Sequence, residues 1–258
     1  MLFCIGTGEP GAPAPAEGGG SVLRLLSNQN FNPTRLIVVS FGAIILLGTF
    51  LLHLPISARD GQFTPWLTCL FTATSATCVT GLVLVDSALH WTPFGQGVIL
   101  AMIQLGGLGF VSLISLIPLL LRRRIGLSQR LAIASAFNLN GMSGVVRVVR
   151  HALMGTFLLE GCGAILLATR FVPLFGWGRG LWYSIFHSVS AFCNAGFDLM
   201  GEHTGAFSSL AGFREDPVVL GTIGCLIVLG GLGFFVWEDC LEHRSWRRLS
   251  FYSRMVLA

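Results

Sequence analysis

Four long apolar stretches constrain this 258-residue chain more than any other feature of its sequence. They cover residues 36–54, 94–121, 152–171 and 218–237. Each holds about the 20 residues that a helix needs to cross roughly 30 Å of hydrocarbon. Charged residues make up 11% of the chain and apolar residues 53%, which excludes an ordinary soluble domain. The sequence therefore predicts an all-α polytopic membrane protein whose surroundings are the lipid bilayer.

The basic residues predict the topology of the chain. All 16 are arginines, and the net charge is +4. Twelve flank one side of the predicted spans, and four fall on the other: Arg59, Arg170, Arg179 and Arg214. By the positive-inside rule, both chain ends and the middle linker are cytoplasmic in a plasma-membrane protein. Because membrane topology accounts for where the arginines lie, the positive net charge does not indicate a nucleic-acid partner, and none is expected.

An internal repeat is the second strong feature. Residues 75–84 read SATCVTGLVL, and 115 positions later residues 190–199 read SAFCNAGFDL. Residues 103–110, IQLGGLGF, return 124 positions later as IVLGGLGF. Pro55 and Pro173, which we expect to end the first helix of each copy, are offset by 118. Such self-similarity indicates two copies of one unit.

A short segment precedes each Ser-Ala block. Residues 64–77 and 181–192 are too few to span a bilayer, so they are re-entrant or interfacial. In the re-entrant interpretation the chain enters as a helix and returns as extended backbone through the glycine. Irregular backbone at that depth is tolerated only where protein buries it or water reaches it. Each copy is then a membrane helix–pore loop–membrane helix repeat.

This arrangement suits a monovalent cation, potassium above all. Removing the ion's water costs on the order of tens of kcal/mol unless other groups replace it. Rings of backbone carbonyls do so in potassium filters, and glycine most easily adopts the dihedrals they need. Gly81 and Gly196 hold that place. The short helices would aim C-terminal ends, each with roughly half a negative charge, at the ion.

Three segments resemble the Trk/Ktr/HKT superfamily of potassium transporters, and within it the bacterial Ktr-type pore subunit. Residues 75–82 are similar to its first filter, residues 186–198 to its second and residues 141–149 to its cytoplasmic linker. The resemblance implies that potassium is bound at the filter by eight backbone carbonyls: those of Cys78, Val79, Thr80, Gly81, Cys193, Asn194, Ala195 and Gly196.

The resemblance also implies the setting of these loops. The family carries four such repeats around one pseudo-fourfold pore, so the chain is identified as the N-terminal two. It implies a homodimer of the full-length protein, a cytosolic nucleotide-binding regulatory ring as partner, and sodium as a candidate coupling ion for symport. No cofactor is expected. An inactive truncated half-transporter remains an alternative, as does a membrane redox enzyme, although no HExxH, Walker or Ser/His/Asp arrangement supports the latter.

The expected organisation has five parts. Residues 1–31 form a disordered cytoplasmic arm, 32–121 the first repeat, and 122–150 a cytoplasmic amphipathic linker. Residues 151–240 form the second repeat, and 241–258 a cytoplasmic segment leading to a missing third repeat.

Several other residues have two possible roles each. Six glycines serve as a hinge or as close-packing sites: Gly106, Gly107, Gly109, Gly230, Gly231 and Gly233. Cys78 and Cys193 either pack behind the filter or sense redox state. Glu160 is functional or a hydrogen-bonded structural acid. His53 and His187 are packing residues or ligands. Asp86, Asp198 and Glu202 either concentrate cations at the outer mouth or are ordinary solvated charges.

Overall fold

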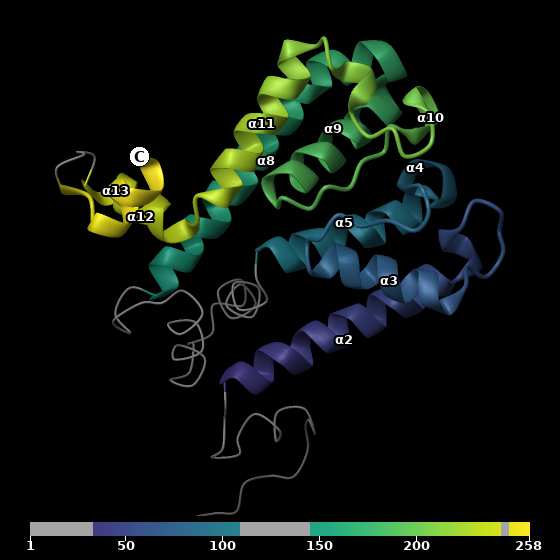
Figure 1. The fold of residues 1–258 in the computed structure, drawn as a ribbon, viewed down its shortest axis with the longest axis horizontal. Coiled ribbons are helices and arrows are strands. Elements are labelled where there is room, and N and C mark those ends of the chain that lie inside the picture. Colours follow the sequence, from purple (N-terminus) through teal and green to yellow (C-terminus); the bar gives the residue numbers. More distant parts are fainter. Residues whose placement is uncertain (1–32, 109–144, 244–247) are drawn as a thin grey trace, which may run out of the picture. The chain divides into compact units, whose positions relative to one another are not determined.

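The structure, a computed structural model, describes residues 33–108, 145–243 and 248–258 (Figure 1). Over these ranges the regular structure is helical, and the one β-type pairing is an isolated bridge between Ala58 and Trp91. The arm predicted at 1–31 and most of the linker predicted at 122–150 lie outside the described residues.

The first copy of the repeat consists of three main helices. These are α2 (Pro33–His53), the short α3 (Trp66–Thr77) and α5 (Pro93–Gly107). The one-turn elements η1 (Pro55–Ser57) and α4 (Ser87–His90) flank α3 in sequence. Helix α3 packs against both α2 and α5.

The second copy has the same order. Its main helices are α8 (Val145–Phe175), the short α9 (Trp177–Phe192) and α11 (Pro217–Gly231), with α10 (Gly201–Thr204) and η2 (Ala211–Phe213) between the last two. Helix α9 packs against α8 and α11, and it also contacts α5 of the first copy. Helices α12 (Phe234–His243) and α13 (Phe251–Leu257) follow and contact each other.

Local sequence explains why α5 and α11 begin where they do. Pro93 and Pro217 stand in the first turn, where a missing backbone N–H costs nothing. Before them, the Thr92 hydroxyl accepts from the Gly95 N–H, and the Asp216 carboxylate accepts from the first backbone N–H groups of α11. Both helices are 15 residues long and end at the paired glycines.

Three expectations about the helices are wrong in detail. Pro173 does not end the helix: α8 continues to Phe175, because a proline in the last turn removes a single hydrogen bond, and Gly176 at φ +80° ends it. Helix α9 begins at Trp177 rather than at 181. Its first turn fits closely against α8, since a Cβ on Gly180 would lie 2.6 Å from the Val172 Cα.

The third correction concerns the span predicted at 218–237, which is not one continuous helix. Helix α11 ends at Gly231 and α12 starts at Phe234, with Gly233 at φ +82° between them. The Trp237 indole N–H donates to the Leu229 carbonyl at 3.3 Å, so one carbonyl freed by the break is satisfied.

Among the described residues, one helical segment, Arg150–Phe175, is long and apolar enough by itself to cross a bilayer. Val38–His53 and Pro217–Gly231 are shorter apolar helices, and much of the predicted span at 94–121 lies outside the described residues. Large apolar side chains such as Leu47, Leu158 and Ile165 are exposed on α2 and α8. Exposed apolar surface of this kind is expected of a protein that faces lipid.

Candidate functional site

Two loops with the same backbone conformation follow the short helices. The first loop covers residues 78–81 after α3, and the second loop covers residues 193–196 after α9. Val79 and Asn194 both have φ +57°, and Gly81 and Gly196 have φ +74° and +71°. A positive φ is an outlier for a β-branched residue such as Val79, and strained backbone of this kind clusters at functional sites in proteins. The 115-residue offset of the sequence repeat is therefore reproduced in the dihedrals.

The shared serines hold both loops in shape. The Thr80 N–H donates to the Ser75 carbonyl at 3.0 Å, and the Ala195 N–H donates to the Ser190 carbonyl at 2.7 Å. The serine hydroxyls add a second bond each. Ser75 Oγ lies 2.9 Å from Thr80 Oγ1, and Ser190 Oγ donates to the Phe197 carbonyl at 2.6 Å. These bonds explain why serine stands at the same place in both copies.

The structure brings the two loops together. A Cβ built on Gly81 would lie 2.8 Å from the Ala195 carbonyl oxygen and 3.2 Å from the Gly196 Cα. The two glycines, far apart in sequence, are therefore neighbours, and neither lies within a helix. Between described residues, no hydrogen bond ends on any carbonyl of residues 78–81 or 193–196. Within the described part of the chain, these eight carbonyl oxygens therefore have no protein donor.

Three of the six predicted glycines, Gly106, Gly107 and Gly230, stand at close packing contacts. A Cβ on Gly106 would lie 2.8 Å from the Thr77 carbonyl carbon, and one on Gly230 would lie 2.8 Å from that of Phe192. Thr77 and Phe192 are the last residues of α3 and α9, so these glycines let α5 and α11 pass the helix ends. Gly107 faces Cys193, since a Cβ built on Gly107 would lie 2.6 Å from the Cys193 Cβ.

The remaining glycines differ in their surroundings. A Cβ on Gly231 would meet only the Asn194 amide, at 3.9 Å. Gly233 has open space and a positive φ, and Gly109 lies outside the described residues. Gly233 therefore stands at the break between α11 and α12, the place where a hinge role stays a prediction.

Glu160 is a buried, hydrogen-bonded acid that joins the two copies. Gln104 Nε2 on α5 donates to Glu160 Oε1 at 3.0 Å, and the Cys193 thiol lies 3.9 Å from the same oxygen. Ser188 Oγ donates to the Glu160 backbone carbonyl at 2.6 Å. These three contacts, with Gln104, Cys193 and Ser188, support a structural role for Glu160.

The two histidines have hydrogen-bonded packing positions. His53 Nδ1 lies 2.7 Å from the Thr64 carbonyl and its ring contacts Phe63 and Trp66. His187 is 2% exposed; its Nδ1 lies 2.7 Å from the Tyr183 carbonyl, and the Leu199 N–H donates to its Nε2. Both ring nitrogens of His187 are thus engaged within the protein.

The cysteines of the two loops are not equivalent in burial. Cys193 is partly buried between Gly107 and Glu160, whereas Cys78 is exposed. Packing accounts for Cys193 but not for Cys78.

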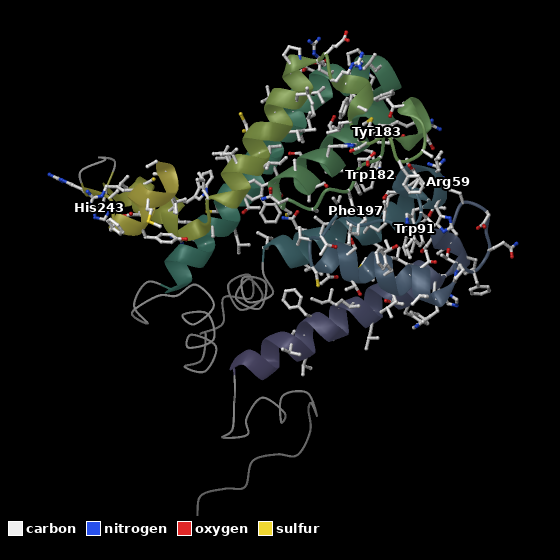
Figure 2. All side chains as sticks on the ribbon, viewed as in Figure 1. Arg59, Trp91, Trp182, Tyr183, Phe197 and His243 are labelled. Carbon is white, nitrogen blue, oxygen red and sulfur yellow. The ribbon has the colours of Figure 1, made fainter. Side chains whose placement is uncertain are left out.

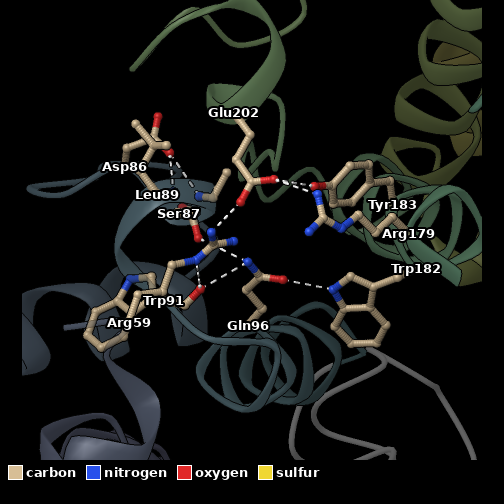
Figure 3. A network of polar contacts seen from close by, with 11 residues as sticks. Arg59, Asp86, Ser87, Leu89, Trp91, Gln96, Arg179, Trp182, Tyr183 and Glu202 are labelled. Atoms are coloured by element: carbon tan, nitrogen blue, oxygen red, sulfur yellow. Dashed lines mark hydrogen bonds and ion pairs between the residues drawn. The ribbon is translucent and has the colours of Figure 1, made fainter. Parts of the chain in front are cut away.

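The acids after the loops are engaged by protein groups. Asp86 accepts from the Ala88 and Leu89 N–H groups and caps α4, and Asp198 accepts from the Met200 N–H at 3.0 Å. Glu202 forms ion pairs with Arg59 and Arg179 (Figure 3). Glu202 is therefore not the ordinary solvated charge considered from the sequence, and its negative charge is balanced by two arginines.

Sequence reasoning missed a polar network in which both copies take part. Arg59, Trp91, Trp182 and Tyr183 gather in one region of the molecule (Figure 2). Trp182 Nε1 donates to Gln96 Oε1 at 2.8 Å, and the Tyr183 hydroxyl donates to Glu202 at 3.2 Å. An arginine in a loop predicted to be outside, and a glutamine in an otherwise apolar helix, were the available signals.

The arrangement suits a partly dehydrated cation. In the described ranges, no three His, Cys, Asp or Glu side chains lie close enough to hold a metal ion. Helices α3 and α9 both end at the loops, so their carbonyl ends add negative potential there. Free carbonyls and helix C-termini together favour a positive ion.

Comparison with known proteins agrees with this chemistry. The cation transport protein family TrkH matches residues 26–257. The chain is 38% identical over 238 residues to the potassium/sodium uptake protein NtpJ of Enterococcus hirae, covering 92% of this chain and 51% of NtpJ. It is also 38% identical to the Ktr system potassium uptake protein B of Bacillus subtilis, covering 88% of this chain and 49% of the relative.

A third relative, the Ktr system potassium uptake protein B of Vibrio alginolyticus, is 36% identical over 83% of this chain and 45% of its own length. The chain spans about half the length of the curated relatives it matches. The resemblance drawn from the loop segments is confirmed, and so is the fold class of an all-α membrane protein. The chain belongs to the TrkH family of cation transport proteins.

Proposed function

We propose that this chain contributes two filter loops to a pore through which potassium crosses the plasma membrane. It acts in this proposal as a pore-forming subunit, or the N-terminal half of one, in a Trk/Ktr-type uptake system. The observation that carries the proposal is the pair of matching loops, which meet at Gly81 and Gly196 and whose eight carbonyls accept no hydrogen bond from any residue that the structure describes.

Potassium binding follows from these carbonyls. The ligands are those of residues 78–81 and 193–196, which replace the water that the ion sheds. Without replacement, the loss of that water costs on the order of tens of kcal/mol. The names of the relatives, potassium uptake protein and potassium/sodium uptake protein, support potassium as the substrate and sodium as a second ion to be tested.

Two loops are half of a pseudo-fourfold ring. Further repeats or a second copy supply the other half in this proposal, and the regulatory ring partner docks on the cytoplasmic face. Reconstitution of the 258-residue chain alone in liposomes, followed by rubidium flux, tests whether two loops per chain suffice. Absence of flux from this preparation supports the alternative of an inactive half-transporter.

The orientation proposal places α4 and α10 outside. Arg59 and Arg179 pair with Glu202, and Arg170 pairs with Asp216 at 3.2 Å. Arg214 pairs with Glu215, so all four arginines predicted to be outside are paired with acids that follow the second loop. The support for the positive-inside assignment, which puts both chain ends in the cytoplasm, is that only these four of the 16 arginines are predicted at this end, since the rule counts basic residues and not net charge.

One substitution pair tests the filter. Gly81→Asp introduces a side chain at φ +74° against the second loop, whereas Gly61→Asp does so at φ +67° with open space around it. In a bacterium deficient in potassium uptake, we expect Gly81→Asp to abolish rescue and Gly61→Asp to preserve it, at equal expression. Rescue by Gly81→Asp at the wild-type level would refute the filter assignment.

A further inference from the structure

Each loop is followed by a carboxylate that is bound to the other copy of the repeat. Asp86 comes five residues after Gly81, and its Oδ2 accepts from the Phe207 N–H of the second copy at 2.8 Å. Glu202 comes six residues after Gly196, and its Oε1 pairs with Arg59 of the first copy. We call these two connections the cross-tie.

The first copy holds Arg59 rigidly for this contact. Its backbone N–H donates to the His90 carbonyl at 2.9 Å, and its Nε donates to the Trp91 carbonyl at 3.2 Å. The neighbouring Ala58 forms the isolated bridge with Trp91. The guanidinium therefore keeps its place without depending on Glu202, unlike the long side chains of most surface pairs.

The second copy holds Glu202 equally well. Its side chain is 15% exposed, and its other oxygen accepts from the Tyr183 hydroxyl at 3.2 Å and faces Arg179 at 3.7 Å (Figure 3). Tyr183 and Arg179 lie on α9, the helix that leads into the second loop. Glu202 thus connects Arg59 with both ends of the segment that carries the second loop.

A buried amide supports the same junction. Gln96 on α5 is 3% exposed, accepts from Trp182 on α9, and donates to the Trp91 carbonyl at 3.1 Å. Because Arg59 donates to that same carbonyl, the contact between α5 and α9 and the cross-tie share one anchor.

The loops themselves do not fix their spacing. Between described residues no hydrogen bond joins residues 78–81 to residues 193–196, and they touch through the glycines and the Ala195 carbonyl. The spacing therefore depends on the surrounding contacts between the copies. In a carbonyl filter, the position and field of the oxygens decide which ion is favoured over its hydrated state.

We propose that the cross-tie sets the spacing of the two loops and so determines the preference for potassium over sodium, with Glu202 and Arg59 as positioning residues. This inference rests on the proposed function, because it needs the loops to be the filter. Neither residue touches the ion; both act through the segments that flank the loops.

Glu202→Ala tests the inference, with Glu215→Ala as its control. Glu215 also follows the second loop and also pairs with an arginine, Arg214, but that pair lies within one loop and is 86% and 80% exposed. Both substitutions remove one negative charge. The protein is expressed in an uptake-deficient bacterium, and sodium and rubidium uptake are measured. Hydrogen exchange of residues 78–86 and 193–202 is followed in purified protein.

We expect Glu202→Ala to raise the sodium-to-rubidium ratio by at least about fivefold, the lower end of coupling between distinct sites. Exchange in both loop segments becomes faster, and Glu215→Ala changes neither readout. Arg59→Ala also raises the sodium-to-rubidium ratio. The double variant Arg59→Ala/Glu202→Ala raises it no further than the more severe single variant, because all three variants lose the same contact.

Three results would overturn the inference. An equal reduction of both ions at an unchanged ratio would make Glu202 a general structural or charge-gathering residue. The same ratio change in Glu215→Ala would assign the effect to surface charge. If the wild-type protein transports neither ion, the proposed function is wrong and the ion ratio no longer tests the cross-tie. In that case hydrogen exchange tests it separately: unchanged exchange of both loop segments in Glu202→Ala would refute the cross-tie.

Discussion

Replacing Gly230 by alanine forces apart two helices that position the second loop. The added Cβ would lie 2.8 Å from the carbonyl carbon and 3.3 Å from the Cα of Phe192, and still nearer to the carbonyl oxygen. Ordinary contact begins at 3.4 Å. The obstacle is backbone, which has no rotamer to change, so α11 must move away from the end of α9 by roughly 1 Å, enough to forfeit a quarter to a half of each dispersion contact.

The control lies on the same helix. A Cβ on Gly224 would have nothing within 4 Å, so Gly224→Ala brings only the gain in helix propensity, up to about 1 kcal/mol. Overpacking of the kind imposed at Gly230 costs about 1–3 kcal/mol. The propensity gain is common to both variants because both glycines lie in α11, so we expect Gly230→Ala to have a free energy of unfolding roughly 1–3 kcal/mol below that of Gly224→Ala.

Denaturant titration of the purified protein in detergent, followed by circular dichroism, measures this difference. The two variants must show the same denaturant slope for their midpoints to be compared. A Gly230→Ala protein as stable as Gly224→Ala would refute the close approach of α11 to the end of α9, and with it the packing role of the paired glycines.

Other changes test other contacts. Asp216→Ala removes the N-cap of α11 and should lower the free energy of unfolding by about 1–2 kcal/mol, measured by the same titration. Glu160→Leu leaves the Gln104 amide without its acceptor and should cost about 1–3 kcal/mol, whereas Glu160→Gln should cost less; equal losses would contradict the contact. Burial lowers the pKa of His90 below its ordinary 6.5, against the opposing charge of Asp60. Stability from neutral His90 is therefore present above pH 6.5 and lost as the pH falls below it, and His90→Asn should flatten that part of a pH–stability curve.

The two loops could be predicted from the sequence because the residues that indicate them are close together along the chain. A glycine at the same place in two blocks indicates a special dihedral, and the shared serines proved to be hydrogen-bonded to the residues next to that glycine. The prolines and caps before α5 and α11 likewise act within one turn. The break before α12 was missed because hydropathy continues through 218–237, and the left-handed Gly233 leaves that apolar run unchanged.

By itself, then, the sequence determined the membrane class, the order of helices in each copy and the identity of the loop residues, because each depends on composition or on neighbours a few positions away. Only the tertiary structure decided that Gly81 meets Gly196, that Gln104 reaches Glu160 and that Arg59 pairs with Glu202. Partners this far apart along the chain are chosen by how helices pack, and no local preference encodes that choice.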